Sequence, residues 1–410
     1  MTPSPSRRFR LTVAGAIAAV LTVAAGVTVW RVLRPTEVVN PAAVAYPTTL
    51  DLVPGKVGAL VTTPLIIDDR LRVYAKNREV WADGPANYHY ELSAYWSYRR
   101  WPAEVVGAVV VRGEQPIVVT AWSDGMLVGI DATAGTVAWR VQSDVLASDY
   151  TGRRTGANTV YVPPGLLTSG STIITVSSKA IRGYRPDGIE AWKRPLITAT
   201  QCHGDEFTSE EQLLVVDTCT HQLHRIRVTD GSDLPTINIS ATSVERVSCE
   251  AEHSPCQGFR AAGKAWITRG TDAVESRTLA AAGSVLVDGV VVTPDRPDNG
   301  TELTGVDETS GATVWRWKAP APIQLLMAGS DRIFVLLNDR TLATVNPHNG
   351  ADLTRSGINL LYEPATPYAV RLAYTSHRYI VLERINPGVP ETADDSAYYF
   401  TNRPALVAIG

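Results

Sequence analysis

The chain repeats one stretch of sequence, Asp131-Ala-Thr-Ala-Gly135-Thr-Val-Ala-Trp139-Arg140. Two close copies are Arg185-Pro-Asp187-Gly188-Ile-Glu-Ala-Trp192-Lys193 and Asp307-Glu-Thr-Ser-Gly311-Ala-Thr-Val-Trp315-Arg316, and in all three a glycine stands four residues before a tryptophan. Weaker copies lie at residues 230–234 and 346–353. The glycines recur at intervals of about 40 residues, or about twice that, which is the length that four short strands and their turns use in a propeller blade. The spacing therefore predicts a ring of β-blades.

Each part of the repeat has a structural reason. Glycine tolerates the positive φ of a tight turn, and an aspartate side chain can hydrogen-bond the backbone of that turn. Short runs rich in β-branched residues precede the turns, as strands require. They are residues 116–121, 126–130, 173–176, 213–216 and 333–337. A tryptophan on the strand after the turn can bury roughly 150–250 Å² against the neighbouring blade, so the repeats predict a belt of tryptophans around the ring.

The same residues resemble a known repeat. The pattern Asp-x-x-x-Gly-x-x-x-Trp, with a small residue (Gly129, Gly305) two positions before the aspartate, is similar to the tryptophan-docking repeat of the PQQ-like propellers. That superfamily includes quinoprotein alcohol dehydrogenases and the non-enzymatic outer-membrane-assembly scaffold of Gram-negative bacteria, and the resemblance covers about residues 90–410. Because enzymes and scaffolds share the repeat, the resemblance does not choose between them.

The expected fold is all-β, a PQQ-like propeller of seven blades, or eight. Trp96 and Gly270 fill two gaps in the series of repeats. The chain ends at residues 404–410 on a stretch that matches the third strand of a blade without its fourth. We expect residues 95–100 to supply that missing outer strand, which would close the ring and remove its open edges.

The N-terminus predicts export. Residues 11–30 carry no charge over the length that a helix needs to cross a bilayer, and Arg7, Arg8 and Arg10 before them favour a cytoplasmic N-terminus. A cleaved signal peptide is the alternative. The predicted domains are a cytoplasmic tail at 1–10, a transmembrane anchor or signal peptide at 11–31, an extended linker at 32–57, and a propeller at 58–410 that includes an accessory segment at 58–90. The bulk of the chain is then extracytoplasmic on a single-pass anchor in the cell membrane, and a composition rich in Arg, Ala, Val and Thr suggests a high-GC Gram-positive bacterium.

Four cysteines favour disulfides in an exported chain. They are Cys202, Cys219, Cys249 and Cys256. Of the three possible pairings we prefer Cys202–Cys219 with Cys249–Cys256, since each closes a local loop. The alternative is a metal site. Its ligands would be Cys202, His203, Cys219, His221 and His224. The metal is less favoured because histidines three residues apart on a strand point to opposite faces, and the chain has no Cys-x-x-Cys pair.

Signals for catalysis are weak. A quinoprotein dehydrogenase holds PQQ, Ca²⁺ and a catalytic aspartate in its central funnel, and such enzymes commonly have adjacent cysteines, which this chain lacks. The stretch Asp295-Arg-Pro-Asp-Asn-Gly-Thr-Glu302 offers oxygens to Ca²⁺, but Asn-Gly between strands favours a hairpin turn. Nucleophile-elbow, phosphate-loop and zincin motifs do not occur. We therefore expect no catalytic, cofactor-binding or metal-binding residues, with PQQ and Ca²⁺ as the alternative.

A cluster of aromatic and basic residues is the candidate partner surface. It consists of Tyr88, Tyr90, Tyr95, Tyr98, Arg99 and Trp101. Tyr, Trp and Arg dominate binding hot spots, and aromatic faces also stack on sugars. The reading that we prefer is packing, with these side chains alternating along an outer strand whose one face lies on the next blade. The acidic run of Asp205, Glu206, Glu210 and Glu211 is likewise read as a solvated loop, with a docking patch as the alternative.

Composition and charge complete the functional prediction. Hydrophobic residues make up 45% and charged residues 19% of the 410 positions, which is ordinary for a folded domain, and a net charge of −3 argues against nucleic-acid binding. We predict a membrane-tethered, extracytoplasmic propeller that binds envelope proteins or cell-wall components without catalysis, through loops on one rim of the ring. The alternatives are a PQQ-dependent dehydrogenase and a sensor that binds a small ligand in the central channel.

Overall fold

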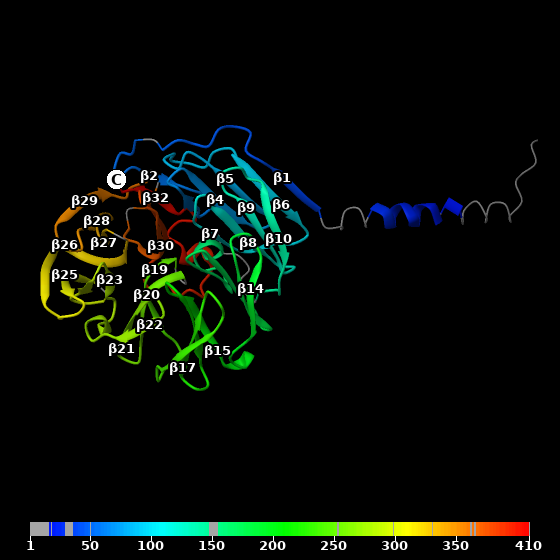
Figure 1. Ribbon diagram of the computed structural model, residues 1–410. Coiled ribbons are helices and arrows are strands. Elements are labelled where there is room, and N and C mark those ends of the chain that lie inside the picture. Colours follow the sequence, from blue (N-terminus) through cyan, green and yellow to red (C-terminus); the bar gives the residue numbers. More distant parts are fainter. Residues whose placement is uncertain are drawn as a thin grey trace, which may run out of the picture.

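The computed structural model is a ring of antiparallel sheets (Figure 1). It describes residues 16–17, 19–28, 36–49, 51–146, 155–251, 254–297, 299–329, 331–360, 363–364 and 366–409. The ring carries four short helical turns. They are α2 (Ala157–Tyr161), α3 (Asp395–Tyr398), η1 (Thr200–Cys202) and η2 (Thr278–Ala280). Strands make up most of the remaining regular structure, so the prediction of an all-β propeller is confirmed.

Six sheets of four or five strands form separate blades. Blade 1 has the strand order β1 (Thr36–Asn40), β6 (Trp96–Trp101), β5 (Glu79–Asp83), β4 (Leu71–Lys76), β3 (Leu65–Ile67). Blade 2 contains β7 (Val105–Val111), β8 (Ile117–Trp122), β9 (Met126–Asp131) and β10 (Val137–Gln142). Blade 3 contains β11 (Leu166–Ser169), β12 (Thr172–Val176), β13 (Ala180–Tyr184) and β14 (Glu190–Pro195). Blade 4 contains β15 (His203–Thr208), β16 (Gln212–Asp217), β17 (Gln222–Arg227) and β18 (Asp233–Asn238). Blade 5 contains β19 (Glu245–Ala251), β20 (Ser254–Ala261), β21 (Lys264–Arg269) and β22 (Asp272–Glu275). The closing blade has the order β2 (Val57–Ala59), β32 (Ala405–Ala408), β31 (Tyr379–Ile385), β30 (Ala369–Thr375).

The seventh sheet, which we call the fused sheet, has seven strands. They are β23 (Val285–Val287), β24 (Val290–Pro294), β25 (Gly300–Asp307), β26 (Thr313–Ala328), β27 (Ile333–Leu337), β28 (Thr341–Val345) and β29 (Asp352–Gly357). Its central strand β26 is 16 residues long and pairs with β25 through its first part and with β27 through its second part. The expectation of seven or eight separate blades is therefore wrong for the described chain. Six blades are separate, because β26 passes without a break from one four-stranded unit into the next.

The ring is closed by the N-terminal part of the chain, as expected, but by a different segment. Residues 57–59 (β2) pair with β32 and supply the fourth strand that the C-terminal stretch lacks. Residues 95–100, which we expected in that role, lie mainly in β6 and pair within blade 1. Much of the predicted accessory segment 58–90 likewise forms β3, β4 and β5 of blade 1. Local patterns identified these segments as strands but could not show which sheet each one joins.

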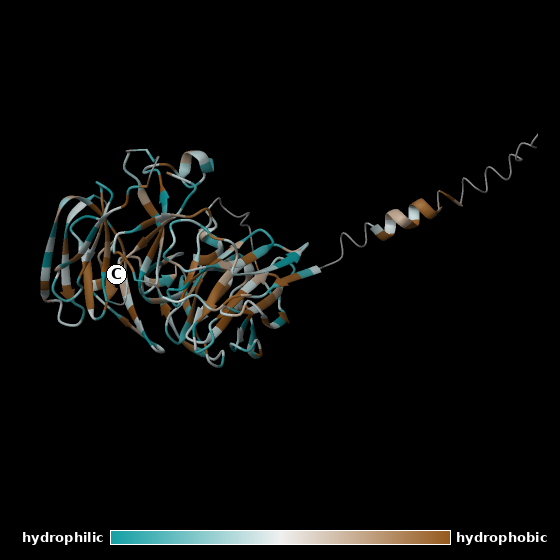
Figure 2. Cartoon of the chain, turned by 90° about the horizontal axis from the view of Figure 1, so that it is seen from above, coloured by the Kyte–Doolittle hydropathy of each residue, from teal (hydrophilic) through white to brown (hydrophobic). Residues whose placement is uncertain are grey.

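Apolar residues follow the strands, and polar residues follow the turns (Figure 2). Central strands such as β8, β16 and β27 are buried along their full length. Outer strands alternate instead, as in β29, where half-buried and exposed residues follow one another. The first strands of neighbouring blades contact one another, for example β7 with β11 and β19 with β23. These first strands therefore surround the axis of the ring, and the last strands form its perimeter.

The structure describes the predicted N-terminal anchor only in part. Residues 16–17 and 19–28 are helical, and the rest of the predicted anchor at 11–31 lies outside the described residues. Within the described part, no helix combines the length and apolar character that crossing a membrane requires. Part of the predicted linker at 32–57 belongs to the ring. Its residues 36–40 form β1, the fifth strand of blade 1.

Candidate binding site at the mouth of the central channel

Tryptophans of the repeat dock on the next turn along the ring. Each indole N–H donates to a main-chain oxygen there, over 2.6 to 2.7 Å. The donor and acceptor pairs are Trp96 to Ala132, Trp139 to Pro186, Trp192 to Val228, and Trp315 to Pro347. Asp131 and Asp307 bind the main-chain N–H groups of their own turns. The repeat thus builds both the turn and the joint between neighbouring units.

Two sets of glycines make room for these rings. An added Cβ at Gly129, Gly183 or Gly305 would lie 2.1 to 2.3 Å from the indole on the neighbouring strand of the same blade. An added Cβ at Gly188 would lie 2.5 Å from Trp139 of the preceding blade. Gly311 differs, because a Cβ there would meet no tryptophan among the described residues. The joint at Gly311 is therefore built without the wedge that the repeat predicts.

The predicted disulfides are confirmed. Cys202 bonds Cys219, and Cys249 bonds Cys256 across the β19–β20 ladder. With Asp217, the first pair forms a cluster of metal-ligating types, but its two sulfurs are already bonded to each other. His203 and His224, ligands of the less favoured metal alternative, contact Glu206 and Asp217 at 2.8 and 3.6 Å. These contacts link residues of blade 4 to one another.

The aromatic cluster is divided between core and surface. Tyr98 is fully buried, and its ring packs edge-on against Trp122. Tyr95 is half-buried and donates to the main-chain oxygen of Thr133 in the next blade. The remaining residues lie at the surface, in two groups. Tyr88 and Tyr90 are exposed and contact each other edge to face, while Arg99 and Trp101 are exposed on β6. The cluster is therefore not one continuous surface.

The acidic run is only partly the solvated loop that we expected, because Asp205 and Glu206 lie in strand β15. Glu206 is partly buried beside His203, and burial raises the pKa of its carboxyl group. Glu210 accepts a hydrogen bond from the main-chain N–H of Gly270 at 2.8 Å. Asp295 accepts hydrogen bonds from the main-chain N–H groups of Thr301 and Glu302, which is turn geometry. Asp298 of the same stretch lies outside the described residues.

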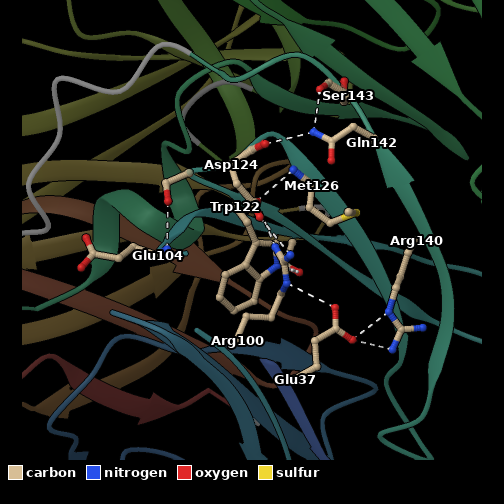
Figure 3. Close-up of polar contacts among 11 residues, drawn as sticks. Glu37, Arg100, Glu104, Trp122, Asp124, Met126, Arg140, Gln142 and Ser143 are labelled. Atoms are coloured by element: carbon tan, nitrogen blue, oxygen red, sulfur yellow. Dashed lines mark hydrogen bonds and ion pairs between the residues drawn. The ribbon is translucent and has the colours of Figure 1, made fainter. Parts of the chain in front are cut away.

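An ion-pair network fixes β1 to the ring (Figure 3). Glu37 of β1 contacts Arg100 of blade 1 at 3.3 Å and Arg140 of blade 2 at 2.7 Å. Arg100 is buried over the ring of Trp122 and donates two hydrogen bonds to Asp124, at 3.0 and 2.9 Å. Burial raises the pKa of Glu37, but hydrogen bonds and the nearby arginine charges outweigh it and hold that pKa below its ordinary value. No sequence pattern signalled this network, since its members are far apart in the chain.

A candidate site lies where inner segments of several sheets meet near the axis. It is a cavity of about 440 Å³. Its polar lining comes from turns and inner strands, and it includes Asp68, Asp69, Arg112, Glu250, Asp331, Arg332 and His377. In Figure 1 the labels of β7, β19 and β30 lie near the middle of the ring. The cavity is therefore the mouth of the central channel. Sequence analysis did not identify these residues, because they belong to different blades.

Two arginines at the mouth are paired with carboxylates. Arg112 of blade 2 reaches across to Glu250 of blade 5 at 2.7 Å and to the Tyr374 hydroxyl of the closing blade at 3.2 Å. The negative potential of the Tyr374 phenol is the largest factor raising the pKa of Arg112. Asp331 is paired with its neighbour Arg332 at 2.8 Å, and this contact lowers the Asp331 pKa. The mouth therefore presents both signs of charge in fixed positions.

Two buried aromatic rings stack next to Arg112 of this mouth. Tyr161 of α2 and Tyr374 of β30 have ring centroids 4.8 Å apart and an angle of 8°. Tyr161 is also held by a 2.7 Å hydrogen bond from its hydroxyl to the main-chain oxygen of Pro64. This packing holds the Tyr374 hydroxyl beside Arg112.

The carboxylates of the mouth accept hydrogen bonds or pair with arginines. Asp68 accepts a hydrogen bond from Tyr46, and Asp69 accepts from the hydroxyl of Ser376 and the main-chain N–H of Arg378. Glu250 and Asp331 are paired with arginines, as described above.

The family of the chain follows from a family-profile comparison. A profile described as "Outer membrane protein assembly factor BamB" matches residues 14–264. The chain belongs to this PQQ-like propeller family. The matched region contains blades 1 to 4 and three strong or weak copies of the repeat, at Gly135, Gly188 and Gly231. No curated protein sequence matches the chain.

Several solved structures are similar to the chain at low sequence identity. BamB from Moraxella catarrhalis is 13% identical, with a TM-score of 0.45, and the match covers 87% of this chain and 100% of that one. The C-terminal WD40 domain of Sif2 is 11% identical, with a TM-score of 0.43 and coverage of 90% and 100%. The computationally designed Ika8 protein is 12% identical, with a TM-score of 0.45 and coverage of 87% and 98%.

Proposed function

We propose that this BamB-family protein is a non-catalytic scaffold of the bacterial cell envelope that binds envelope proteins or cell-wall components at the channel mouth. Membership of the family supports a binding role at a coarse level, and the partner is our inference from the site. The observation that carries the proposal is the pairing of charged groups at the mouth. A cavity whose carboxylates and arginines hold one another in place is pre-organised for recognition, while a general acid or base needs a group free to exchange protons.

The shape of the ring supports the same role. Four tryptophan joints and an ion-pair network hold the blades at fixed angles, so loops around the mouth are presented on a rigid support. The lining also mixes acidic, basic and apolar side chains, including Phe334 and Met327 beside Arg332. Such a surface suits a protein loop or a polar glycan better than a uniformly charged polymer.

We also propose that the N-terminal segment tethers the ring to the membrane, with the ring outside the cytoplasm. The last helical residue that the structure describes is Thr28, and Thr36 begins β1 on the perimeter of blade 1. Eight residues of chain span at most about 29 Å. A tether of this length would keep the edge that carries blades 1 and 2 close to the bilayer. Protease protection of the full chain in membrane vesicles, compared with a chain that begins at residue 36, tests this arrangement.

Site-specific crosslinking tests the binding role. A photoreactive amino acid at Gln257 or His377, both in the mouth, is expected to capture the same envelope component in intact cells. The matched control places the group at exposed Val145, away from the mouth. Equal capture from all three positions, or capture from none, would contradict the proposal. Native mass spectrometry of the purified chain addresses the sensor alternative, since a small molecule retained in the mouth would favour that function instead.

A further inference from the structure

The joint between blade 5 and the fused sheet has an unfilled wedge position. Its turn glycine, Gly311, is exposed, and an added Cβ there would have the Thr278 methyl group as its described neighbour, at 3.6 Å. The same added Cβ at Gly188, Gly231 or Gly350 would lie 2.5 to 2.8 Å from a tryptophan ring. The turn is thus built to receive an indole that blade 5 does not supply.

The sequence of blade 5 explains why no tryptophan fills this position. Val274 stands four residues after Gly270, where the other repeats place tryptophan, and its side chain is 65% exposed. It pairs with Ile267 across the ladder. In blades 2 and 3 the corresponding pairs are Trp139 with Gly129 and Trp192 with Gly183. Blade 5 has therefore exchanged both members of the pair, since an isoleucine leaves no room for an indole on the neighbouring strand.

A groove of about 740 Å³ lies at this position. Ile267 and Val274 line it from blade 5, and Gly311 lines it from the fused sheet. Thr278 Oγ1 donates to the main-chain oxygen of Glu308 at 3.3 Å. That oxygen corresponds to the indole acceptors of the other joints, because Glu308 directly follows the residue that opens its turn. Thr278 thus uses the main-chain acceptor that a tryptophan binds in the other joints, but it does not fill the space that an indole would occupy.

A second feature of the groove points to a ligand. The Glu308 side chain is 9% exposed and pairs through Oε1 with Arg269. Its other oxygen, Oε2, is buried without a hydrogen-bond partner in the described residues. A buried carboxylate oxygen without a donor is costly. Because Glu308 lines the groove, a small shift of its side chain would let an N–H group bound there donate to this oxygen.

A joint without a tryptophan need not be open, as the joint between blades 4 and 5 shows. Between blades 4 and 5, buried Arg225 donates to Gln212 and to the main-chain oxygen of Thr271. Gln212 in turn donates to the oxygens of Gly270 and Asp272. Polar side chains therefore fill that joint and bind its turn, and the blade 5–fused sheet joint keeps a groove.

We propose that this groove is the docking site for an aromatic side chain, an indole, carried on an extended segment of a partner polypeptide. The inference rests on the proposed scaffold function and adds a second contact surface, on the perimeter. The ring itself shows the chemistry of the occupant, because four of its own joints bind an indole against an equivalent turn. β22 ends its sheet with an unpaired edge among the described strands, and β1 on β6 shows that an outer edge of this ring accepts an added strand.

A peptide copied from the protein's own wedge tests the proposal. The probe is the blocked hexapeptide Val-Ala-Trp-Arg-Val-Gln, the sequence of β10, titrated by calorimetry into the purified full chain. A second peptide has alanine in place of tryptophan. The tryptophan peptide is expected to bind at least about tenfold more tightly than the alanine peptide, in line with the large contribution of aromatic anchors. Equal binding of the two peptides, or no binding of either, would overturn the proposal.

Two variants locate the binding. Ile267→Gly combined with Val274→Trp restores the pair of the other blades, fills the groove from within, and is expected to reduce peptide affinity at least about tenfold. Leu353→Trp on β29, at another exposed outer-strand position, is the matched control and should leave it unchanged. If the double variant does not fold, Val274→Cys labelled with a bulky maleimide after purification gives the same block. Peptide binding that survives a filled groove would place it elsewhere and overturn the proposal. Crosslinking from the channel mouth should persist in these variants, so loss of one function is distinguishable from loss of the other.

Discussion

The indole N–H of Trp192 donates a 2.7 Å hydrogen bond to the main-chain oxygen of Val228, which fastens blade 3 to blade 4. The Trp192 side chain is 8% exposed, and its indole packs on Gly231, which lies in the same turn as Val228. Buried apolar residues form several separate clusters, including one that joins the inner strands of blades 3 and 4 around Trp192. The stability of the ring therefore depends on contacts between neighbours, repeated around the circle.

Removing one of the docking tryptophans should destabilise the propeller strongly. Trp192→Ala is expected to lower the free energy of unfolding by roughly 3–5 kcal/mol, because it removes a buried ring and leaves a cavity. Chemical denaturation measures this loss. Trp101→Ala is the control, since Trp101 is 38% exposed and outside the joints, and it should cost less than about 1 kcal/mol. Equal losses in both variants would contradict the role of the joints.

Adding a methyl group beneath an indole should also lower the stability of the protein. Gly183→Ala would place its Cβ 2.3 Å from the ring of Trp192, so the strand or the ring must move. We expect a loss of about 1–3 kcal/mol, the usual cost of overpacking. Gly113→Ala is the matched control, since a Cβ there meets nothing within 4 Å. Melting temperatures of the two variants give the comparison, and a tolerated Gly183→Ala would mean that the joint is loosely packed.

Acid should loosen the contact between β1 and the ring. The folded-state pKa of Glu37 lies below its ordinary value of 4.5, so the unfolded chain binds its proton more readily. The stabilisation is therefore fully present above about pH 4.5 and is lost as pH falls through the folded-state pKa. The same sign holds for Asp124, where hydrogen bonds from Arg100 outweigh burial and lower the pKa.

Stability measured at several pH values between about 6 and 3 tests this prediction. The wild-type protein should lose stability with acid more steeply than Glu37→Gln, which has no proton to gain at that position. Glu114→Gln changes an exposed glutamate in a turn and should follow the wild-type curve. Parallel curves for all three proteins would show that Glu37 does not contribute.

The two disulfides should differ in their effect. Replacing Cys202 and Cys219 by serine opens a loop of 17 residues and is expected to cost about 3 kcal/mol, while the Cys249–Cys256 loop of 7 residues should cost about 2 kcal/mol. Denaturation of each double variant measures the difference. Because Cys249 lines the channel mouth, only the second variant should also weaken crosslinking from Gln257. The reverse order of costs would show that loop length is not the deciding factor.

Truncation should separate the two N-terminal strands. A chain that begins at residue 36 keeps β1 and β2 and should fold with near full stability. A chain that begins at residue 61 loses both strands and also Leu60, which is fully buried. We expect it to lose at least about 4 kcal/mol, since one buried leucine accounts for roughly 3. A stable, monomeric product of the second truncation would contradict closure by β2.

Much of the fold could be predicted from the sequence because its signals are local. Turn glycines, β-branched runs and tryptophans lie within about ten residues of one another, so each repeat by itself predicts its hairpin. The disulfides were also predictable, since each closes a short loop. The number of separate blades was not predictable, because the continuity of β26 depends on the relative orientation of two neighbouring hairpins.

The candidate sites could not be predicted in the same way. Arg112 and Glu250 are 138 residues apart in the chain and meet at the channel mouth. The groove at Gly311 is visible in the sequence only as a valine where a tryptophan is expected, and its open volume depends on Ile267 and Thr278 of the opposing surface.

The sequence by itself determined the hairpins, their turns and the wedges that join one blade to the next, because these depend on backbone preferences and on contacts between successive repeats. Only the tertiary structure decided which strand closes the ring, which charges meet at the mouth and which joint is left open. Those features need residues from distant blades to converge, and that convergence is set by the closure of the whole circle.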